Sequence, residues 1–319
     1  MIPSQWLTEA HDRIRSAVQQ TPLGYDERND LLVKWENRQV TGSFKARGAL
    51  NRLLGAAPGE AERGLVCASA GNHGHALARG ARQLGVQVEV FVGENAAPVK
   101  IAAMRALGAV VHVVPGGYAE AEAAGRLHAS ESQRVWISAY NDPLVIAGQA
   151  TVALEAMEQL ENQKPLVWVV PVGGGGLIAG IGAALRARGQ RARLVGVQPT
   201  DNAFMKALFY TGSQDGLKDL PSLADGLTGA VEPQSVTIPL VKSLVDEIVT
   251  VSEEDIARAI AWAWYEHRQV IEGSGAVSLA ALLFGQISAR PALAVVTGGN
   301  IDPARHATIV RKFKGAFEA

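Results

Sequence analysis

The chain has 319 residues, with 30 Lys and Arg against 31 Asp and Glu, so its formal net charge is −1. Its length allows about two domains of ~150 residues. A charge near zero argues against partners such as nucleic acid or an anionic membrane, because both require an excess of basic side chains. Apolar residues make up 48% of the chain, as in a packed globular protein. The single cysteine, Cys67, can form no internal disulfide, and residues 1–20 hold no apolar stretch long enough for a signal peptide, so we expect a cytoplasmic protein.

Helical and strand patterns alternate along the chain from about residue 45. The spacing of apolar residues predicts helices, in chain order, at about 45–56, 73–84, 97–107, 118–130, 144–160 and 252–268, with an alanine-rich helix after 275. It predicts strands near 64–69, 86–92, 110–114, 134–138, 166–172, 193–198 and 292–297. Strands that alternate with helices indicate an α/β fold with parallel sheets.

The section between about 50 and 140 contains four strand–helix units that could form a sheet of their own. The segments before and after this section could then pair with each other. We therefore expect a small domain, residues 49–140, inserted into a large domain made of residues 1–48 and 141–319.

Four consecutive glycines, Gly173 to Gly176, follow an apolar strand and precede a helix. Backbone N–H groups in a loop without side chains, together with the N-terminus of the helix, can surround a phosphate group. The segment 166–185 carries no charge over twenty residues, which is also the length of a membrane helix. Pro171 and the glycines would leave backbone groups unsatisfied in lipid, so the membrane interpretation is disfavoured. We predict a phosphate-binding loop, with a purely structural turn as the alternative.

The sequence from Gly174 to Ala179 also fits the loose Gly-x-Gly-x-x-Ala pattern of dinucleotide-binding proteins. A nicotinamide-dependent oxidoreductase is therefore an alternative. That pattern requires an acidic residue about twenty positions later to bind the ribose. Because no Asp or Glu occurs between Leu177 and Thr200, this alternative is disfavoured.

Three further motifs are rich in small and polar residues: TGSFK at 41–45, SAGNH at 69–73 and TGGNID at 297–302. Taken alone, each has a simple structural explanation, such as a surface lysine with Ser43 as a helix cap, or a glycine turn with an asparagine cap. Lys45 could instead form a Schiff base. A Ser–Lys hydrolase dyad is disfavoured, because it needs Ser-x-x-Lys spacing. The seven histidines lack ligand spacing, so no metal site is predicted.

The motifs VTGSFKARGA, SAGNHGHALA, PVGGGGLIAG, ADGL, EGSGAVSLAAL and TGGNID follow one another between about Thr21 and Asp302. This ordered set resembles the fold-type II pyridoxal-phosphate enzymes, specifically the threonine/serine dehydratase and serine racemase group. The resemblance implies the tryptophan synthase beta-like fold, in which two open, twisted, mostly parallel sheets are flanked by helices. It also implies a small domain that closes on the substrate, and assembly as a homodimer or homotetramer.

The resemblance implies pyridoxal 5′-phosphate as the cofactor and a set of residues that bind it. Lys45 would hold the cofactor as a Schiff base and act as general base, while Asn72 would bind the 3′ oxygen and Thr297 the pyridine nitrogen. The implied cofactor residues are Phe44, Lys45, Asn72, Gly173, Gly174, Gly175, Gly176 and Thr297. The implied substrate residues, which would receive the carboxylate, are Ser69, Gly71, Asn72 and His73.

The activity implied by the resemblance is the removal of water from an L-β-hydroxy amino acid, giving a 2-keto acid and ammonia. Threonine, serine, 3-hydroxyaspartate and a β-aryl serine all remain candidate substrates, because they share the reacting groups. An amino-acid racemase is the alternative enzyme, and a phosphate-binding regulatory module, which would be colourless, is the alternative that is not an enzyme. Serine racemases that resemble this chain have a serine where it has Ala70, whose methyl group cannot transfer a proton, so we expect elimination.

Two departures from the group affect further expectations. Gln198 stands where the group commonly has a glutamate leading into a cation site, and Phe204 lies near a second expected acidic position. These replacements argue against a bound divalent cation. The chain ends soon after Asp302, so we expect no C-terminal regulatory domain.

Overall fold

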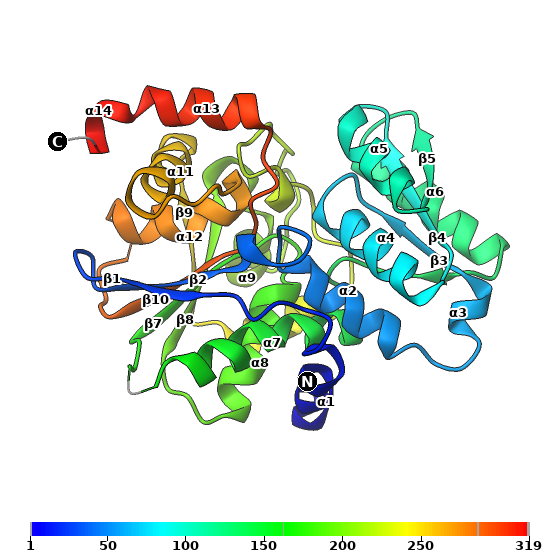
Figure 1. The fold of residues 1–319 in the computed structure, drawn as a ribbon, viewed down its shortest axis with the longest axis horizontal. Helices are drawn as coiled ribbons and strands as arrows, with labels where there is room; N and C mark the ends of the chain where they lie inside the picture. The colour runs from blue at the N-terminus through cyan, green and yellow to red at the C-terminus, as the bar shows by residue number, and fades with distance from the viewer. Residues whose placement is uncertain (1, 162, 286, 318–319) are drawn as a thin grey trace.

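The computed structural model describes residues 2–161, 163–285 and 287–317, which form two sheets covered by helices (Figure 1). The strands are β1 Leu23–Asp26, β2 Leu31–Trp35, β3 Leu65–Ala68, β4 Val88–Gly93, β5 Val110–Val114, β6 Val135–Trp136, β7 Val167–Pro171, β8 Arg193–Pro199, β9 Glu247–Val251 and β10 Ala292–Val296. The α-helices are α1 Ser4–Ile14, α2 Lys45–Leu54, α3 Glu60–Arg63, α4 Asn72–Leu84, α5 Pro98–Ala106, α6 Tyr118–Glu131, α7 Pro143–Gln159, α8 Gly176–Ala187, α9 Phe204–Thr211, α10 Thr237–Leu244, α11 Glu253–His267, α12 Gly273–Leu283, α13 Pro303–Lys312 and α14 Lys314–Phe317. Short 3-10 turns are η1 Glu36–Arg38, η2 Thr200–Asn202 and η3 Asp225–Leu227.

The larger sheet has six strands in the order β1-β2-β10-β7-β8-β9. All neighbouring strands run parallel except β1, which is antiparallel to β2. Successive side chains of a strand point to opposite faces, and in β7 both faces are apolar. Trp168 and Val170 pack in the core that contains residues of α7 and α8, whereas Val167 and Val169 pack in the core that contains α11 and α12. Burial on both faces explains the continuous apolar strands of the sequence.

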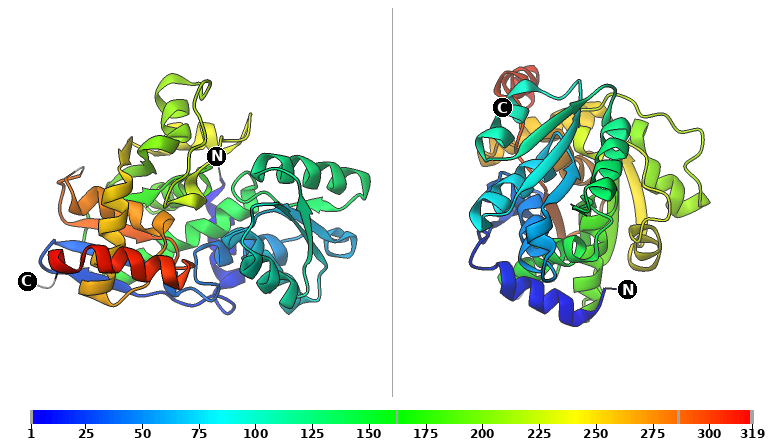
Figure 2. Two further views of the ribbon diagram at one scale, coloured as in Figure 1. Left: turned by 90° about the horizontal axis from the view of Figure 1, so that it is seen from above. Right: turned by 90° about the vertical axis from the view of Figure 1, so that its right-hand side faces the viewer.

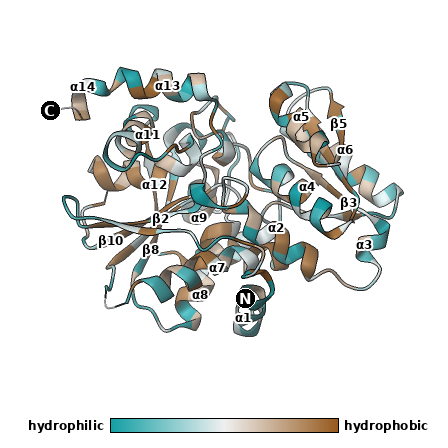
Figure 3. Cartoon of the chain, in the orientation of Figure 1, coloured by the Kyte–Doolittle hydropathy of each residue, from teal (hydrophilic) through white to brown (hydrophobic). Residues whose placement is uncertain are grey.

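The smaller sheet has four parallel strands in the order β5-β4-β3-β6, all of them from the section 65–136. Residues of α4 contribute to the core on one face, and residues of α6 to the core on the other. Figure 2 shows this unit beside the six-stranded one, and Figure 3 shows hydrophobic residues along the strands of both sheets. The α/β class with two mostly parallel sheets is the one predicted from the sequence, and it is confirmed.

The uncharged segment 166–185 forms β7, the glycine loop and most of α8. Within the described residues, no helix is long and apolar enough to cross a membrane. The predicted strand at 110–114 coincides with β5, and the strand predicted at 134–138 is shorter, at Val135–Trp136.

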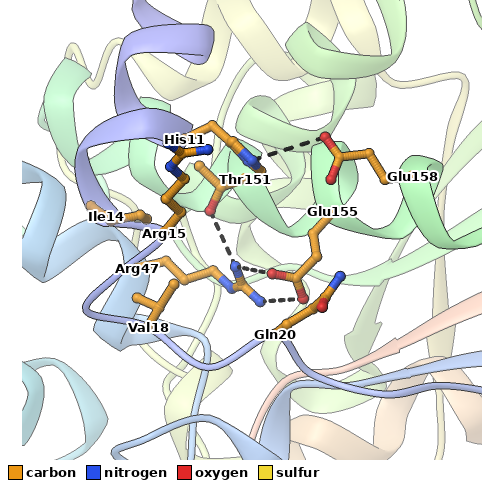
Figure 4. Close-up of a pocket in the computed structure, with 9 residues that line it drawn as sticks. All are labelled: His11, Ile14, Arg15, Val18, Gln20, Arg47, Thr151, Glu155 and Glu158. Atoms are coloured by element: carbon orange, nitrogen blue, oxygen red, sulfur yellow. Dashed lines mark hydrogen bonds and ion pairs between the residues drawn. The ribbon is translucent and has the colours of Figure 1, made fainter.

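A buried ionic network ties α2 to the larger sheet and to α7. Arg47, two residues after Lys45, donates to Glu36 at 2.7 and 2.8 Å and to Glu155 at 2.9 and 3.1 Å. Lys34 in β2 donates to the same Glu155 at 2.6 Å. Figure 4 draws Arg47 and Glu155 at the wall of a pocket beside α1. Because these charges are paired and almost inaccessible to water, the start of α2 is held in one position.

Candidate active site

The TGSFK motif lies against the end of β10. The backbone N–H of Phe44 donates to the carbonyl of Thr297 at 3.0 Å, and Ser43 forms an antiparallel bridge with Gly298. The helix α2 begins at Lys45 and has no side-chain cap. The interpretation of Ser43 as a helix cap beside a surface lysine is therefore wrong, and the motif brings Lys45 to the carboxyl end of a parallel strand.

The side chain of Lys45 is half-buried. Its Nζ donates to the carbonyl of Ala139 at 3.1 Å and lies 5.0 Å from the centre of the Phe44 ring. Burial lowers the pKa of Lys45 to about 8, against the opposing charge of Glu272. More of this amine is neutral near pH 7 than in an ordinary lysine, and only the neutral amine can act as a nucleophile or a base.

The tetraglycine loop follows β7 and opens α8, whose first backbone N–H groups have no partner within the helix. A Cβ atom on Gly174 would lie 2.3 Å from Cγ of Tyr140, so the Tyr140 ring covers this position closely. Gly175 has a φ of +87°, which favours glycine. A Cβ atom on Gly176 would lie 3.0 Å from Tyr140. Protein atoms thus leave no room for side chains at these positions, and the backbone N–H groups of the loop and of the α8 N-terminus are the donors that fit an anionic group such as a phosphate.

The SAGNH motif connects β3 to α4. Gly71 precedes the helix and Asn72 is its first residue. The Asn72 side chain does not cap α4 but contacts Glu272 and Asn300, which lie in the EGSG and TGGNID motifs. The interpretation of Asn72 as a simple helix cap is therefore wrong. Three motifs that are far apart in the sequence meet at this side chain.

The other predicted site residues, Ser69, Gly71, His73 and Thr297, lie in the loop before α4, at the start of α4 and directly after β10. In the loop, the backbone N–H of Gly71 donates to the hydroxyl of Ser69 at 3.2 Å. His73 is buried, and burial together with the charge of Lys45 lowers its pKa to about 3, so its ring is neutral. Thr297, at the end of β10, is buried and donates to the carbonyl of Ser274 at 3.3 Å.

Gln198 and Phe204, the two departures from the group, are both buried. The Gln198 amide donates to the carbonyl of Asn202 at 3.3 Å and accepts from the backbone N–H of Lys206 at 2.7 Å. Its polar atoms are therefore used by nearby backbone. In the described parts of the chain, no group of three or more His, Cys, Asp or Glu residues could hold a metal ion.

Sequence reasoning missed three residues of this region: Glu272, Asn300 and Tyr140. The first two lie within motifs that were recognised, next to glycines, but no role was assigned to them. Burial, followed by the charge of Asp225, raises the pKa of Glu272 to about 7. Tyr140 had no signal beyond its place before the Asp-Pro start of α7, and its hydroxyl accepts from the backbone N–H of Glu232 at 2.9 Å.

Comparison with known proteins identifies the family. Residues 14–298 match the family model described as pyridoxal-phosphate dependent enzyme. The L-threonine ammonia-lyase of Thermotoga maritima is 38% identical over 310 residues, which are 95% of this chain and 76% of the relative. The catabolic L-threonine dehydratase TdcB of Escherichia coli K12 is 35% identical over 94% of this chain and 93% of its own length.

Solved structures agree with the sequence relatives. The processed form of threonine deaminase isoform 2 from Solanum lycopersicum has a TM-score of 0.89 and 28% identity, over 98% of this chain and 88% of its own. Maize serine racemase has a TM-score of 0.88 and 27% identity, over 99% of this chain and 98% of its own. These findings confirm the resemblance and make pyridoxal phosphate the cofactor, which disfavours the nicotinamide alternative further. The chain belongs to the pyridoxal-phosphate-dependent enzymes of fold type II, in the threonine/serine dehydratase and serine racemase group.

Proposed function

We propose that this lyase removes water from an L-β-hydroxy amino acid of the threonine or serine type, with Lys45 as its catalytic residue. One observation carries the assignment to Lys45. The adjacent residues Ala139 and Tyr140 contact the Lys45 amine and Gly174 respectively, so the amine and the glycine loop both lie next to one short segment. A cofactor with an aldehyde at one end and a phosphate at the other requires this pairing of a lysine with an anion site.

We propose the cofactor contacts that the motifs imply. Gly173, Gly174, Gly175 and Gly176 would surround the phosphate, Phe44 would lie beside the ring, and Asn72 and Thr297 would bind the 3′ oxygen and the ring nitrogen. The bound ring supplies an electron sink for negative charge at the substrate Cα. The Phe44 ring beside the Lys45 amine, and the place of Thr297 directly after β10, support this arrangement.

Lys45 also supplies the acid–base chemistry in this proposal. With a pKa of about 8, its amine accepts the Cα proton more readily than a fully charged lysine would. The loop of Ser69, Gly71, Asn72 and His73 precedes and opens α4, a helix of 13 residues whose N-terminus favours a carboxylate. Loss of the β-hydroxyl as water gives an enamine, which hydrolyses to the 2-keto acid and ammonia.

The division into domains is also a proposal. Residues 49–140 would be a small domain that closes on the substrate, and residues 1–48 with 141–319 the large domain. Two ion pairs support closure: Lys100 with Asp225 at 4.0 Å, and Arg126 with Glu232, each joining the two units. By the family resemblance we further propose a cytoplasmic homodimer or homotetramer, which light scattering would distinguish from a monomer.

Elimination is favoured over racemisation by the loop before Asn72. Ala70 stands there with a methyl group, and Ser69 is engaged within the loop, since its hydroxyl accepts from the backbone of Gly71. A racemase needs a second acid–base group on the face of Cα opposite Lys45. The likeness to maize serine racemase keeps a racemase as the second candidate.

The purified, cofactor-loaded protein should form 2-keto acid from L-threonine or L-serine, with little D-isomer. The four candidate amino acids are each incubated with the enzyme, keto acid is assayed, and the remaining substrate is resolved by chiral chromatography. Ala70→Ser should introduce some racemisation. Faster accumulation of the inverted isomer than of keto acid would favour the racemase. A protein that stays colourless after incubation with pyridoxal phosphate and forms no keto acid would instead favour a phosphate-binding regulatory module.

A further inference from the structure

A chain of hydrogen bonds between side chains joins the SAGNH motif to the large unit. Asn300 Nδ2 donates to the carbonyl of Thr41 at 2.9 Å and to Asn72 Oδ1 at 2.7 Å. Asn72 Nδ2 in turn donates to Glu272 Oε1 at 2.7 Å. The chain thus runs from Thr41, four residues before Lys45, through Asn300 and Asn72 to a buried carboxylate.

Counting donors fixes the orientation of the Asn72 side chain. A carboxamide nitrogen carries two N–H groups and its oxygen carries none. Asn300 uses both of its N–H groups, so the atom of Asn72 that faces it must be the oxygen. The Asn72 nitrogen then faces Glu272, where one N–H is used and the other remains to donate. The reverse orientation would place two nitrogens together and an amide oxygen against a carboxylate.

Glycines make room for both partners of Asn72. A Cβ atom on Gly42 would lie 2.4 Å from Asn300 Oδ1, and a Cβ atom on Gly298 would lie 2.3 Å from Glu272 Oε1. Either clash would displace a partner of Asn72. The glycines of the TGSFK and TGGNID motifs are thus explained by side chains that approach the backbone.

We propose that Asn300 and Glu272 are positioning residues that hold the Asn72 carboxamide as a hydrogen-bond donor toward the 3′ oxygen of the cofactor. The inference rests on the proposed role of Asn72. Because Asn72 lies in the 49–140 unit and both partners lie in the other unit, the orientation depends on the two units being together. Loss of Asn300 therefore weakens the cofactor contact made by Asn72, although Asn300 need not touch the cofactor.

The test is a double-mutant cycle in the holoenzyme, made with Asn72→Ala, Asn300→Ala and the pair. Two properties are measured besides turnover: the dissociation constant for pyridoxal phosphate, and the pH midpoint of the visible absorption of the lysine-bound cofactor. Each single variant should raise the dissociation constant about 2- to 10-fold, as expected for one hydrogen bond. Both single variants should also shift the pH midpoint, and in the same direction as each other. The double variant should resemble Asn72→Ala alone, because both substitutions remove one contact.

Two more variants sharpen the test. Asn300→Asp keeps the size of the side chain but replaces the donor with an acceptor, so it should impair cofactor binding at least as much as Asn300→Ala. Should Asn300→Ala fail to fold by circular dichroism, the same cycle is run with Asn300→Asp. Arg126→Gln, which breaks another contact between the two units without touching Asn72, should leave the midpoint unchanged.

The outcomes separate the inference from the proposed function. If Asn72→Ala changes both properties but the Asn300 variants change neither, the positioning role is wrong and the Asn72 assignment stands. Additive effects in the double variant would also overturn the positioning role. If Asn72→Ala changes neither property, the assignment of Asn72 to the 3′ oxygen is itself wrong.

Discussion

Two effects oppose each other at the Lys45 amine. Burial lowers its pKa, because a charged amine is poorly solvated inside the protein, and the nearby carboxyl group of Glu272 raises it again. Burial wins, and the pKa is about 8. The pKa of Glu272 is itself raised to about 7, so neither group is fully charged near neutral pH. A lysine amine that is partly neutral near pH 7 is suited both to forming a Schiff base with the cofactor and to accepting a proton from the substrate.

Lys45→Ala should remove cofactor attachment and turnover together. The visible absorption of the lysine-bound cofactor is expected to disappear, while far-UV circular dichroism stays that of the unmodified protein, because α2 is still held by Arg47. Turnover is expected to fall by at least about 10³-fold, or ~4 kcal/mol of barrier. Near-normal turnover without an added amine would show that another residue is the base.

In the proposed site, Thr297 offers a neutral hydroxyl to the ring nitrogen of the cofactor, whereas a carboxylate there would keep that nitrogen protonated. A ring that is not protonated is a weaker electron sink, which favours prompt elimination over side transamination. Thr297→Asp should therefore lower the elimination rate by at least about tenfold, or ~1.4 kcal/mol, and raise the share of transamination products. Keto acid and aminated cofactor are measured by chromatography. An unchanged rate and product ratio would mean that Thr297 only ends β10.

At the scale of elements, the loop between β7 and α8 is shaped by the side chain of Tyr140, which lies between β6 and α7. Gly174→Ala would drive a methyl group into the Tyr140 ring. We expect an overpacking cost of about 1–3 kcal/mol and a dissociation constant for pyridoxal phosphate raised at least about tenfold. Fluorescence titration of the cofactor-free protein with pyridoxal phosphate measures this dissociation constant.

Two further variants test the cause of that effect. Gly315→Ala is the matched control, because a Cβ atom there meets nothing within 4 Å. Adding Tyr140→Ala to Gly174→Ala should restore part of the cofactor affinity, since the clash is removed. No restoration would indicate that the methyl group acts on the loop itself rather than through Tyr140.

The elements differ in how far the sequence could predict them. The buried parallel strands, such as β7 and β8, were predictable because apolar side chains fill both of their faces. The strand β2 was missed, and its sequence LLVKW includes a lysine. Lys34 is fully buried there, and its charge is balanced by Glu155, 121 residues away. Only the folded structure brings that partner close.

Some features of the candidate site could be predicted from the sequence and others could not. The glycine loop and the lysine motif are local patterns, so the sequence predicts them. The contacts of Asn72 with Glu272 and Asn300 join residues that are 200 and 228 positions apart. No local pattern contains such a pair, and the approach of the two units creates it.

At the scale of the whole molecule, the larger sheet is built from chain segments on both sides of the smaller one. The strands β1 and β2 precede the section 65–136, whereas β7 to β10 follow it. The network of Lys34, Glu36, Arg47 and Glu155 joins these two segments inside the protein. Glu155 is central, because both cations donate to it.

Glu155→Gln should lower the free energy of unfolding by about 3–5 kcal/mol, because it leaves buried cations without a charged partner. Burial alone would raise the pKa of Glu155, but the charges of Arg47 and Lys34 outweigh burial and hold the pKa below its usual value. A depressed carboxyl pKa stabilises the folded state above the unfolded pKa of about 4.5, and this contribution is lost as the pH falls through the folded pKa. The difference between the variant and the unmodified protein should therefore be largest near pH 7 and shrink in acid.

Urea unfolding at pH 7 and at a series of pH values below 4.5 measures how this difference shrinks. Glu158→Gln is the matched control, because Glu158 lies in the same helix, is 56% exposed, and among the described residues forms an ion pair only with His11, at 3.9 Å (Figure 4). The control should change stability by less than about 0.5 kcal/mol, as exposed pairs contribute little. Equal losses in the two variants would mean that the network does not hold the two segments together. In that case the apolar packing of α7 against α8 and α2 would have to account for the position of Lys45.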